Sequence, residues 1–334
     1  MPRTVAIVIP ILDDWTSFAA LVGQISHQFT GCGVRFLVYA VDDGSTAPFD
    51  LDGIVLPEDS CIESIEVIHL ALNLGHQRAI AVGLCTVAGA DDIDSVLVMD
   101  GDGEDRPADI AALLAANLHN PTRVVVAQRT RRSEPGFFRL GYCVYKLLFR
   151  ALTGQRISSG NFCIMPRAAV ERLVRMPELW NNLAATIMRS RLPYVSVPTV
   201  RGLRFAGHSK MGLPSLIVHG LSAMSVHIDT IFARLLLAAA SIGGIAVFGI
   251  LVVGVIRSAT DLAILGWATT IVGDLLIILL QMLIIMAAAS LTMLAGRSSR
   301  PIVPIVDFRP FVARRQRFLF SQSLAAPAVA EPAS

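Results

Sequence analysis

Short apolar runs alternate with amphipathic segments over the first 130 residues. The runs are rich in β-branched residues and stop at polar residues, which predicts strands at 4–12, 34–41, 64–70, 95–99 and 123–127. Segments with helical spacing lie between them, among them 15–29 and 76–88. Strands that alternate with helices predict an α/β fold with a mostly parallel sheet covered on both faces.

The pattern changes after residue 210. Residues 213–229 put apolar side chains on one helical face and Ser, His and Asp on the other, which is typical of a helix lying at a membrane surface; a helix facing a core is the alternative. The next segment, 235–256, has no charged residue, and 266–294 has only Asp274. Each is long enough to cross a bilayer, and the short link between them predicts a hairpin.

Basic residues suggest how this hairpin is oriented. Six arginines follow the second apolar segment, whereas the loop of the hairpin has only Arg257. The positive-inside rule therefore predicts a multi-pass protein of the cytoplasmic membrane, with both the C-terminus and the N-terminal domain in the cytoplasm. Asp274 predicts either a functional carboxylate inside the membrane or a contact between helices.

Composition supports the same division. The 334 residues are 54% hydrophobic and 16% charged, against about a quarter charged in soluble domains. Residues 1–210 have 20 basic and 21 acidic residues, and residues 211–334 have only 8 and 5. We therefore expect a globular domain at 1–210, a juxtamembrane helix at 211–232, two spans at 233–296, and a basic tail at 297–334 with a disordered end.

The net charge of +2 conceals an uneven distribution. Residues 1–110 have 18 acids and 4 bases, whereas residues 120–210 have 3 acids and 16 bases. This split predicts a site that holds a metal ion on one side and phosphate on the other. Nucleic acid is not expected as a partner, because aromatic residues do not alternate with the bases. The five cysteines include no Cys-x-x-Cys pair, which favours reduced thiols.

Carboxylates follow three of the predicted strands. They are Asp13 and Asp14, Asp42 and Asp43, and the run Asp100-Gly-Asp-Gly-Glu-Asp105. Because ligands bind at the carboxyl ends of parallel strands, these residues indicate the site. Alternating carboxylates in the run suit Mg²⁺ or Mn²⁺. A calcium loop does not fit, because its glycine and distal glutamate are missing; solvated loop carboxylates are the remaining alternative.

The order of these motifs resembles family 2 glycosyltransferases of the GT-A fold. Within that family the chain looks like the polyprenyl-phosphate glycosyltransferases, which include dolichyl-phosphate mannose synthases and bactoprenol glucosyltransferases. The resemblance covers about residues 4–306. The segments that carry it are Pro10-x-x-Asp-Asp14, Asp42-Asp-Gly-Ser-Thr46, Asn73-Leu-Gly-His-Gln77, Asp100-x-Asp-x-Glu-Asp-x-Pro107, Arg204-Phe-Ala-Gly-His-Ser-Lys210 and the terminal hairpin.

The resemblance implies roles in binding a nucleotide-sugar donor. Asp42, with Asp43, would accept hydrogen bonds from the base and ribose. Asp102 and Glu104 would hold the Mg²⁺ or Mn²⁺ ion on the donor diphosphate, with Asp100 close to both metal and sugar. Relatives commonly have Gln at the position of Glu104. The other residues expected around the donor and the bound phosphates are Pro10, Asp14, Gly75, Arg204, Ser209 and Lys210.

Further residues are implied for the acceptor, a lipid phosphate. Arg129 and Arg131, with Arg132 less strongly, would grip the phosphate together with Arg204 and the pair Ser209-Lys210. A basic loop attracted to anionic lipid is the alternative. Asn161 stands where many relatives have an Asp proposed as a base. An amide cannot take a proton, but a phosphate monoester has a second pKa of about 6 and arrives largely ionised. We expect Asn161 to position the acceptor.

The sequence thus predicts an enzyme that transfers one sugar, with inversion, from a nucleotide-diphosphate sugar to a polyprenyl phosphate. UDP and GDP remain equally open, and relatives suggest a homo-oligomer such as a tetramer. One alternative is a processive polysaccharide synthase, disfavoured because no Gln-x-x-Arg-Trp motif occurs and only two spans follow the domain. Another is a catalytically silent membrane scaffold that only binds nucleotide.

Overall fold

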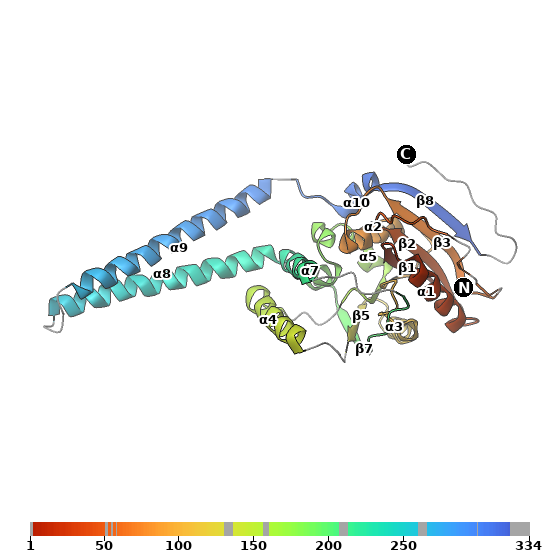
Figure 1. The fold of residues 1–334 in the computed structure, drawn as a ribbon, viewed down its shortest axis with the longest axis horizontal. Coiled ribbons are helices and arrows are strands. Elements are labelled where there is room, and N and C mark those ends of the chain that lie inside the picture. Colours follow the sequence, from red (N-terminus) through yellow and green to blue (C-terminus); the bar gives the residue numbers. More distant parts are fainter. Residues whose placement is uncertain are drawn as a thin grey trace. The chain divides into compact units, whose positions relative to one another are not determined.

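The computed structural model describes residues 3–50, 53–54, 56–57, 59–129, 136–155, 160–206, 213–259, 266–298 and 300–320. The chain divides into two compact units (Figure 1). The first comprises Met1–Lys146, Arg156–Val226 and Ile302–Ser334, and contains the sheet. The second comprises Leu147–Gln155 and His227–Pro301, and contains two long helices.

A single sheet forms the centre of the first unit. Its order is β7-β5-β6-β4-β1-β2-β3-β8. The strands are β1 (Arg3–Ile11), β2 (Val34–Asp42), β3 (Ile62–Leu70), β4 (Ser95–Val98), β5 (Val124–Arg129), β6 (Cys163–Pro166), β7 (Tyr194–Thr199) and β8 (Val312–Leu319). Neighbours among β4, β1, β2 and β3 run parallel, as do β5 and β7. β6 and β8 run antiparallel to their neighbours. The predicted mostly parallel α/β sheet is confirmed.

Helices cover both faces of this sheet, which explains its continuous apolar strands. Val5, Ile7 and Ile9 of β1 pack with α1 (Trp15–Gln28) and α3 (Pro107–His119). Ala6 and Val8 pack in the opposite layer with α2 (His76–Ala88), α5 (Arg167–Leu173) and α6 (Leu183–Arg189). Two shorter elements of this unit are η1 (Pro177–Trp180) and α10 (Pro304–Asp307).

The C-terminal segment does not behave as the predicted tail. After α10 and η2 (Arg309–Phe311), residues 312–319 form β8, which pairs antiparallel with β3 along the edge of the sheet (Figure 1). The sequence does not predict this strand, because its four charged or amide side chains are typical of a solvated basic tail. The predicted disordered end, 321–334, lies outside the described residues.

In the second unit the apolar side chains lie mostly on the surface, whereas in the first unit they form the core. α8 (Ile228–Ala259) and α9 (Trp267–Ser298) are antiparallel and pack against each other (Figure 1). Both are long and apolar enough to cross a membrane, with a mean hydropathy of 2.5 in their best windows. Only 17% and 0% of those windows is buried. Large apolar side chains such as Phe248 and Leu291 therefore face outward.

Two further helices precede the long apolar pair in the sequence. α4 (Gly136–Thr153) follows β5, and α7 (Leu213–Ser225) is shorter than the predicted amphipathic helix. The side chains of residues 136–144 and 213–217 lie outside the described part of the chain. The prediction that 213–229 lies at a membrane surface therefore stays a prediction.

Candidate active site

Three acidic segments meet at one edge of the sheet. β4, β1 and β2 are adjacent and parallel, so their carboxyl ends lie on the same side. Asp13 and Asp14 follow β1, Asp42 and Asp43 lie at the end of β2, and residues 100–105 follow β4, which we call the acidic loop. Ile11 of β1 is level with Asp42 of β2. The topology therefore brings together carboxylates that are far apart in the sequence.

The loops after β1 and β2 brace each other. The Asp13 amide donates to Ser45 Oγ at 2.8 Å, and Asp13 Oδ1 accepts from the amide and hydroxyl of Thr46 at 2.7 and 2.9 Å. Asp13 has a φ of 47°, a left-handed conformation that Asp tolerates better than most residues. These contacts make Asp13 a structural residue that fixes the edge of the site.

Asp42 is buried and engaged at both oxygens. Oδ1 accepts from the Ser45 amide at 2.9 Å, and Oδ2 lies 2.8 Å from His69 Nδ1. Burial works to raise the pKa of Asp42, but the hydrogen bonds from His69 and Ser45 outweigh it and leave the pKa below its ordinary value. Asp42 is therefore an ionised acceptor with a fixed orientation.

Asp43 is turned toward the start of α2. Its Oδ1 accepts from the Leu74 amide at 2.7 Å, and its Oδ2 accepts from the Gly75 amide at 3.0 Å. Gly75 has a φ of 90°, which an L side chain would strain, and it is the N-cap of α2. Burial raises the pKa of Asp43 despite these bonds. The main task of Asp43 in this geometry is to hold the turn before α2.

The acidic loop is a tight turn stabilised by its own carboxylates. Asp102 Oδ1 accepts from the Glu104 amide at 2.9 Å, and Asp105 Oδ2 accepts from the Asp100 amide at 3.0 Å. Gly103 has a φ of 89°, and a Cβ there would meet the ring of Phe205 at 2.6 Å. Glycine is thus required both for the turn and for the close approach of the segment that carries Phe205.

Arg129, at the end of β5, contacts the buried side of this loop. Its guanidinium donates to Asp105 Oδ1 at 3.0 Å and lies 3.8 Å from Glu104 Oε2. Burial, followed by the neighbouring charge of Asp100, raises the pKa of Asp105 to about 7, although Arg129 opposes the shift. Arg129 therefore compensates carboxylates that burial makes costly to ionise.

A segment after β7 covers the acidic loop from the other side. The Gly202 amide donates to the Glu104 carbonyl at 2.8 Å, and the Phe205 amide donates to the Asp102 carbonyl at 2.9 Å. Arg201 Nη2 donates to Glu104 Oε1 at 2.7 Å. No sequence motif marks Arg201, and its place in the basic half of the domain is the only signal for it.

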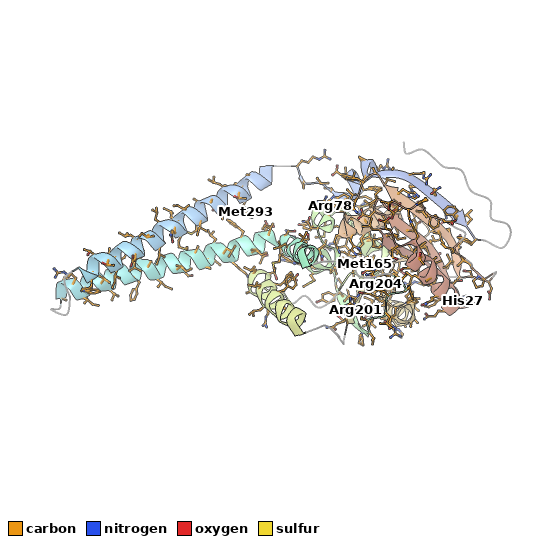
Figure 2. All side chains as sticks on the ribbon, viewed as in Figure 1. His27, Arg78, Met165, Arg201, Arg204 and Met293 are labelled. Carbon is orange, nitrogen blue, oxygen red and sulfur yellow. The ribbon has the colours of Figure 1, made fainter. Side chains whose placement is uncertain are left out.

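Arg204 links two of the acidic segments. Its guanidinium lies 3.3 Å from both Asp14 Oδ2 and Asp102 Oδ2. Figure 2 shows Arg204 beside Arg201 on the segment after β7. Burial raises the pKa of Asp102, the charges of Asp100 and Glu104 add to this, and Arg204 partly offsets it. The site therefore brings a positive charge to the carboxylate that was predicted as a metal ligand.

Asn161 lies beside the start of α2. Its Nδ2 is 3.1 Å from His76 Nε2, and its Oδ1 accepts from Gln77 Nε2 at 3.2 Å. The same His76 nitrogen lies 3.2 Å from Asp100 Oδ1. Burial alone would lower the pKa of His76, but Asp100, Asp43 and Asp102 raise it above its ordinary value. A small polar network thus connects Asn161 to the acidic loop.

The sequence identifies the protein family to which this chain belongs. The profile of glycosyl transferase family 2 matches residues 6–173, half of the chain. The chain belongs to glycosyl transferase family 2. The matched residues include the three acidic segments and Asn161, so this family 2 domain contains the whole strand edge described above.

Curated relatives agree with this membership. An uncharacterised glycosyltransferase of Bacillus subtilis, YkcC, is 25% identical over 81% of the chain and 83% of its own length. An undecaprenyl-phosphate 4-deoxy-4-formamido-L-arabinose transferase of Salmonella typhimurium is 24% identical over 64% of the chain and 64% of its own length. The chain thus matches about two thirds of the length of this second relative.

One solved structure is similar to part of the chain. It is glucosyl-3-phosphoglycerate synthase from Mycobacterium tuberculosis in complex with Mn²⁺, UDP-glucose and phosphoglyceric acid. The likeness covers 70% of the family 2 glycosyltransferase described here and 79% of that chain, at 18% identity and a TM-score of 0.45.

The remaining predicted site residues are Pro10 and four residues that the structure does not describe. Pro10 lies in β1, level with Val41 of β2, just before the acidic segment. Arg131, Arg132, Ser209 and Lys210 lie outside the described residues. The phosphate-binding roles predicted for these four residues of the family 2 glycosyltransferase therefore stay predictions.

The donors for a metal ion lie on the acidic loop. Among the residues that the structure describes, no group of three His, Cys, Asp or Glu side chains is arranged to hold a metal. The chemistry of the loop nevertheless fits a hard divalent cation, because Asp100 and Asp102 offer the carboxylate oxygens that such ions prefer; in the described structure His76 and Arg204 lie against these oxygens. Of the three predicted metal ligands, Glu104 is the least free to bind an ion together with Asp100 and Asp102, since it bonds Arg201 and faces Arg129.

Proposed function

We propose that this family 2 glycosyltransferase moves a single sugar from a nucleoside diphosphate sugar to a polyprenyl phosphate. The observation that carries the proposal is the presence, on one chain, of a family 2 domain and two long apolar helices. Outward-facing apolar side chains suit a bilayer, where a prenyl acceptor resides. The printed activity of the Salmonella relative, an undecaprenyl-phosphate transferase, supports the same acceptor class.

The donor is bound at the edge formed by β1, β2 and β4. Asp42 accepts a hydrogen bond from the nucleoside, while Asp43 holds the turn at Leu74 and Gly75 that shapes the same edge. Asp102 and Asp100 hold Mg²⁺ or Mn²⁺ on the donor diphosphate. When bound, the ion neutralises the charge that develops on the departing nucleoside diphosphate.

The acceptor phosphate is bound by arginines of the basic half. In the described structure the guanidinium groups of Arg204 and Arg129 lie against carboxylates of the acidic loop, and this position supports the assignment. Both can donate two parallel hydrogen bonds to a phosphate. Arg131, Ser209 and Lys210 complete this group in the proposal.

The reaction is a single in-line displacement. An ionised phosphate oxygen of the acceptor forms the new bond to the anomeric carbon as the bond to the diphosphate oxygen breaks, so the configuration inverts. No proton has to be removed from a phosphate that is already ionised, since its second pKa is about 6. Asn161, hydrogen-bonded to Gln77 and beside His76, orients the acceptor in this scheme and takes up no proton.

The chain also favours one orientation in the membrane. β8 follows the two apolar helices and pairs with β3, so the chain leaves the sheet-containing unit and returns to it. A pair of spans satisfies this connectivity, because an even number of crossings brings the chain back to the same side. The arginines that follow α9 favour the cytoplasm as that side.

The test is a transfer assay with the full chain in membranes. Membranes are incubated with undecaprenyl phosphate, Mn²⁺ or Mg²⁺ and a panel of labelled UDP- and GDP-sugars. We expect organic-extractable label from one donor, lost on adding EDTA and lost in Asp102→Ala. The control variant is Asp92→Asn, which changes an exposed carboxylate before β4.

Other outcomes would contradict the proposal. Label that reaches only a water-soluble acceptor would assign the domain to a different reaction. Nucleotide binding with no transfer from any donor would identify a silent scaffold.

A further inference from the structure

A line of side-chain contacts connects the C-terminal strand to Asp42. His69 of β3 faces Asp42 Oδ2 with Nδ1 at 2.8 Å, and its Nε2 lies 2.9 Å from Oε1 of Gln316 in β8. Gln316 Oε1 also accepts from Arg314 Nη2 at 2.8 Å. A residue from beyond the two apolar helices, 247 positions away from His69, thus supports the carboxylate at the end of β2.

The chemistry of these groups limits which atoms can donate and which can accept in each contact. Arg314 can only donate, so its bond fixes Oε1 of Gln316 as the atom that faces His69. The ionised carboxylate of Asp42 can only accept. Nδ1 of His69 therefore donates to Asp42, and Nε2 of the same ring lies 2.9 Å from Gln316 Oε1. Arg314 itself lies farther from His69 Nε2, at 3.5 Å.

Contacts on both sides of Gln316 hold β8 in register. Arg315 Nε donates to the buried Glu66 at 2.6 Å, and the Phe320 amide donates to the Glu63 carbonyl at 2.9 Å. Arg314 is level with His69 in the antiparallel pairing. This register places Gln316 within reach of the His69 ring, where a shift of one residue would turn its side chain to the other face of the sheet.

We propose that Gln316 and His69 are positioning residues for the donor, which hold Asp42 in the orientation that accepts a hydrogen bond from the nucleoside. The inference rests on the proposed function, in which Asp42 meets the nucleoside. The Ser45 amide fixes one oxygen of Asp42 and His69 fixes the other, so the lone pairs left over point in set directions. The strand that follows the membrane helices thereby becomes part of the nucleotide site.

The test measures nucleotide binding, which needs no lipid acceptor. Purified full-length chain in detergent is titrated calorimetrically with UDP and with GDP, and donor kinetics are measured in parallel. Gln316→Met keeps the size of the side chain and removes the oxygen that faces His69. We expect it to weaken binding of the cognate nucleoside diphosphate, and to raise the donor KM, by about five- to tenfold, as for loss of one ordinary intramolecular hydrogen bond.

Two further variants separate positioning from stability. Gln316→Glu keeps an oxygen facing His69 and should restore binding to within about twofold of wild type. Arg317→Met, next along β8 and exposed, is the matched control and should bind as wild type does. In Gln316→Met the kcat and the KM for the prenyl phosphate should stay within about twofold, whereas a merely structural defect would lower kcat and the melting temperature together.

The outcomes distinguish this inference from the function on which it rests. Wild-type binding in Gln316→Met, with weakened binding in Asp42→Asn, would overturn the inference and leave the donor site intact. Wild-type binding in Asp42→Asn would overturn it too, while extractable product would still support the proposed reaction. If no extractable product forms from any donor, the proposed function fails, and the binding series still decides whether Gln316 acts on Asp42.

Discussion

The acidic segments after β2 and after β4 contain the same kind of side chain but hold different partners. Asp43 accepts from the backbone amides of Leu74 and Gly75, and Asp42 accepts from the Ser45 amide. The carboxylates of the acidic loop also accept from backbone amides, but they face guanidinium groups as well, with Arg204 on Asp102 and Arg129 on Asp105. Backbone amides are fixed by the fold, whereas a guanidinium on a flexible stem can leave. We therefore expect the β2 end to keep its shape and the acidic loop to exchange cations.

The largest expected effect on sugar transfer follows removal of a charge from the acidic loop. Asp102→Asn should lower sugar transfer by about 10²–10³-fold, because the carboxylate that would hold the metal is lost. The melting temperature should change little, since the amide oxygen can still accept from the Glu104 amide. Transfer is measured as extractable label, and unfolding by a thermal scan. A variant with normal transfer and a large drop in stability would reverse the proposed contrast.

A smaller loss of sugar transfer is expected when the guanidinium of Arg204 is removed. Arg204→Gln should lower kcat/KM by about ten- to hundredfold, mainly through the KM for the prenyl phosphate, as for loss of charge-assisted hydrogen bonds. Arg204→Lys should recover part of this loss, because it keeps the charge but not the fork. Arg123→Gln, which changes an exposed arginine before β5, is the control. An unchanged KM for the acceptor would remove Arg204 from the phosphate site.

The buried carboxylate of the acidic loop predicts a pH dependence of stability. The pKa of Asp105 is about 7 in the folded protein and about 4 when unfolded. Between these values the folded state holds a proton that the unfolded state has released, so the free energy of unfolding falls as pH rises from about 4 to 7. Asp43, Asp102 and His76, whose pKa values are also raised, act with the same sign, and Asp42 opposes them.

Asp105→Asn isolates this contribution. The melting temperature of the wild type should fall between about pH 5 and pH 8, and that of the variant should fall less. The difference corresponds to a change in the free energy of unfolding on the order of 1–3 kcal/mol. Thermal scans of both proteins at the two pH values measure it. If the variant depends on pH as strongly as the wild type, Asp105 does not change its protonation in this range.

The smallest expected effect on chemistry comes from the end that keeps its shape. Asp43→Asn loses a charged hydrogen bond to the turn before α2, which should cost about 1–2 kcal/mol and lower the melting temperature by about 2–4 °C. The kcat/KM should fall by less than about threefold. A thermal scan and the transfer assay measure the two effects. A loss of transfer as large as that in Asp102→Asn, with unchanged stability, would show that Asp43 contacts substrate.

The sequence predicted the parallel half of the fold closely. α2 has the predicted bounds, and β1, β2 and β4 differ from theirs by at most one residue at either end. These elements are encoded locally, by apolar runs and helical spacing that stop at polar residues. β6, β7 and β8 escaped prediction, because β6 has only four residues and every second residue of β7 is exposed up to Pro198. β8 is also exposed and basic, so no apolar run marks it.

The candidate site divides in the same way. The strand ends that carry Asp14, Asp42 and Asp100 could be located from the sequence, because a polar residue after an apolar strand is a local pattern. Their partners could not, since Arg204 reaches Asp14 from 190 positions away and Gln316 reaches His69 from 247. Such contacts depend on strand order and register, which a single sequence does not state.

The position of β8 in the chain also imposes an order on biosynthesis. A ribosome makes β3 first, then both apolar helices, and only afterwards the strand that covers the edge of β3. The nascent domain therefore has an unpaired β3 edge until both apolar helices have been synthesised. Unpaired strand edges invite association with other chains, so this interval is the one in which a chaperone or rapid membrane targeting would matter most. Full assembly of the sheet becomes a late event, reached only by chains whose hairpin has already been synthesised.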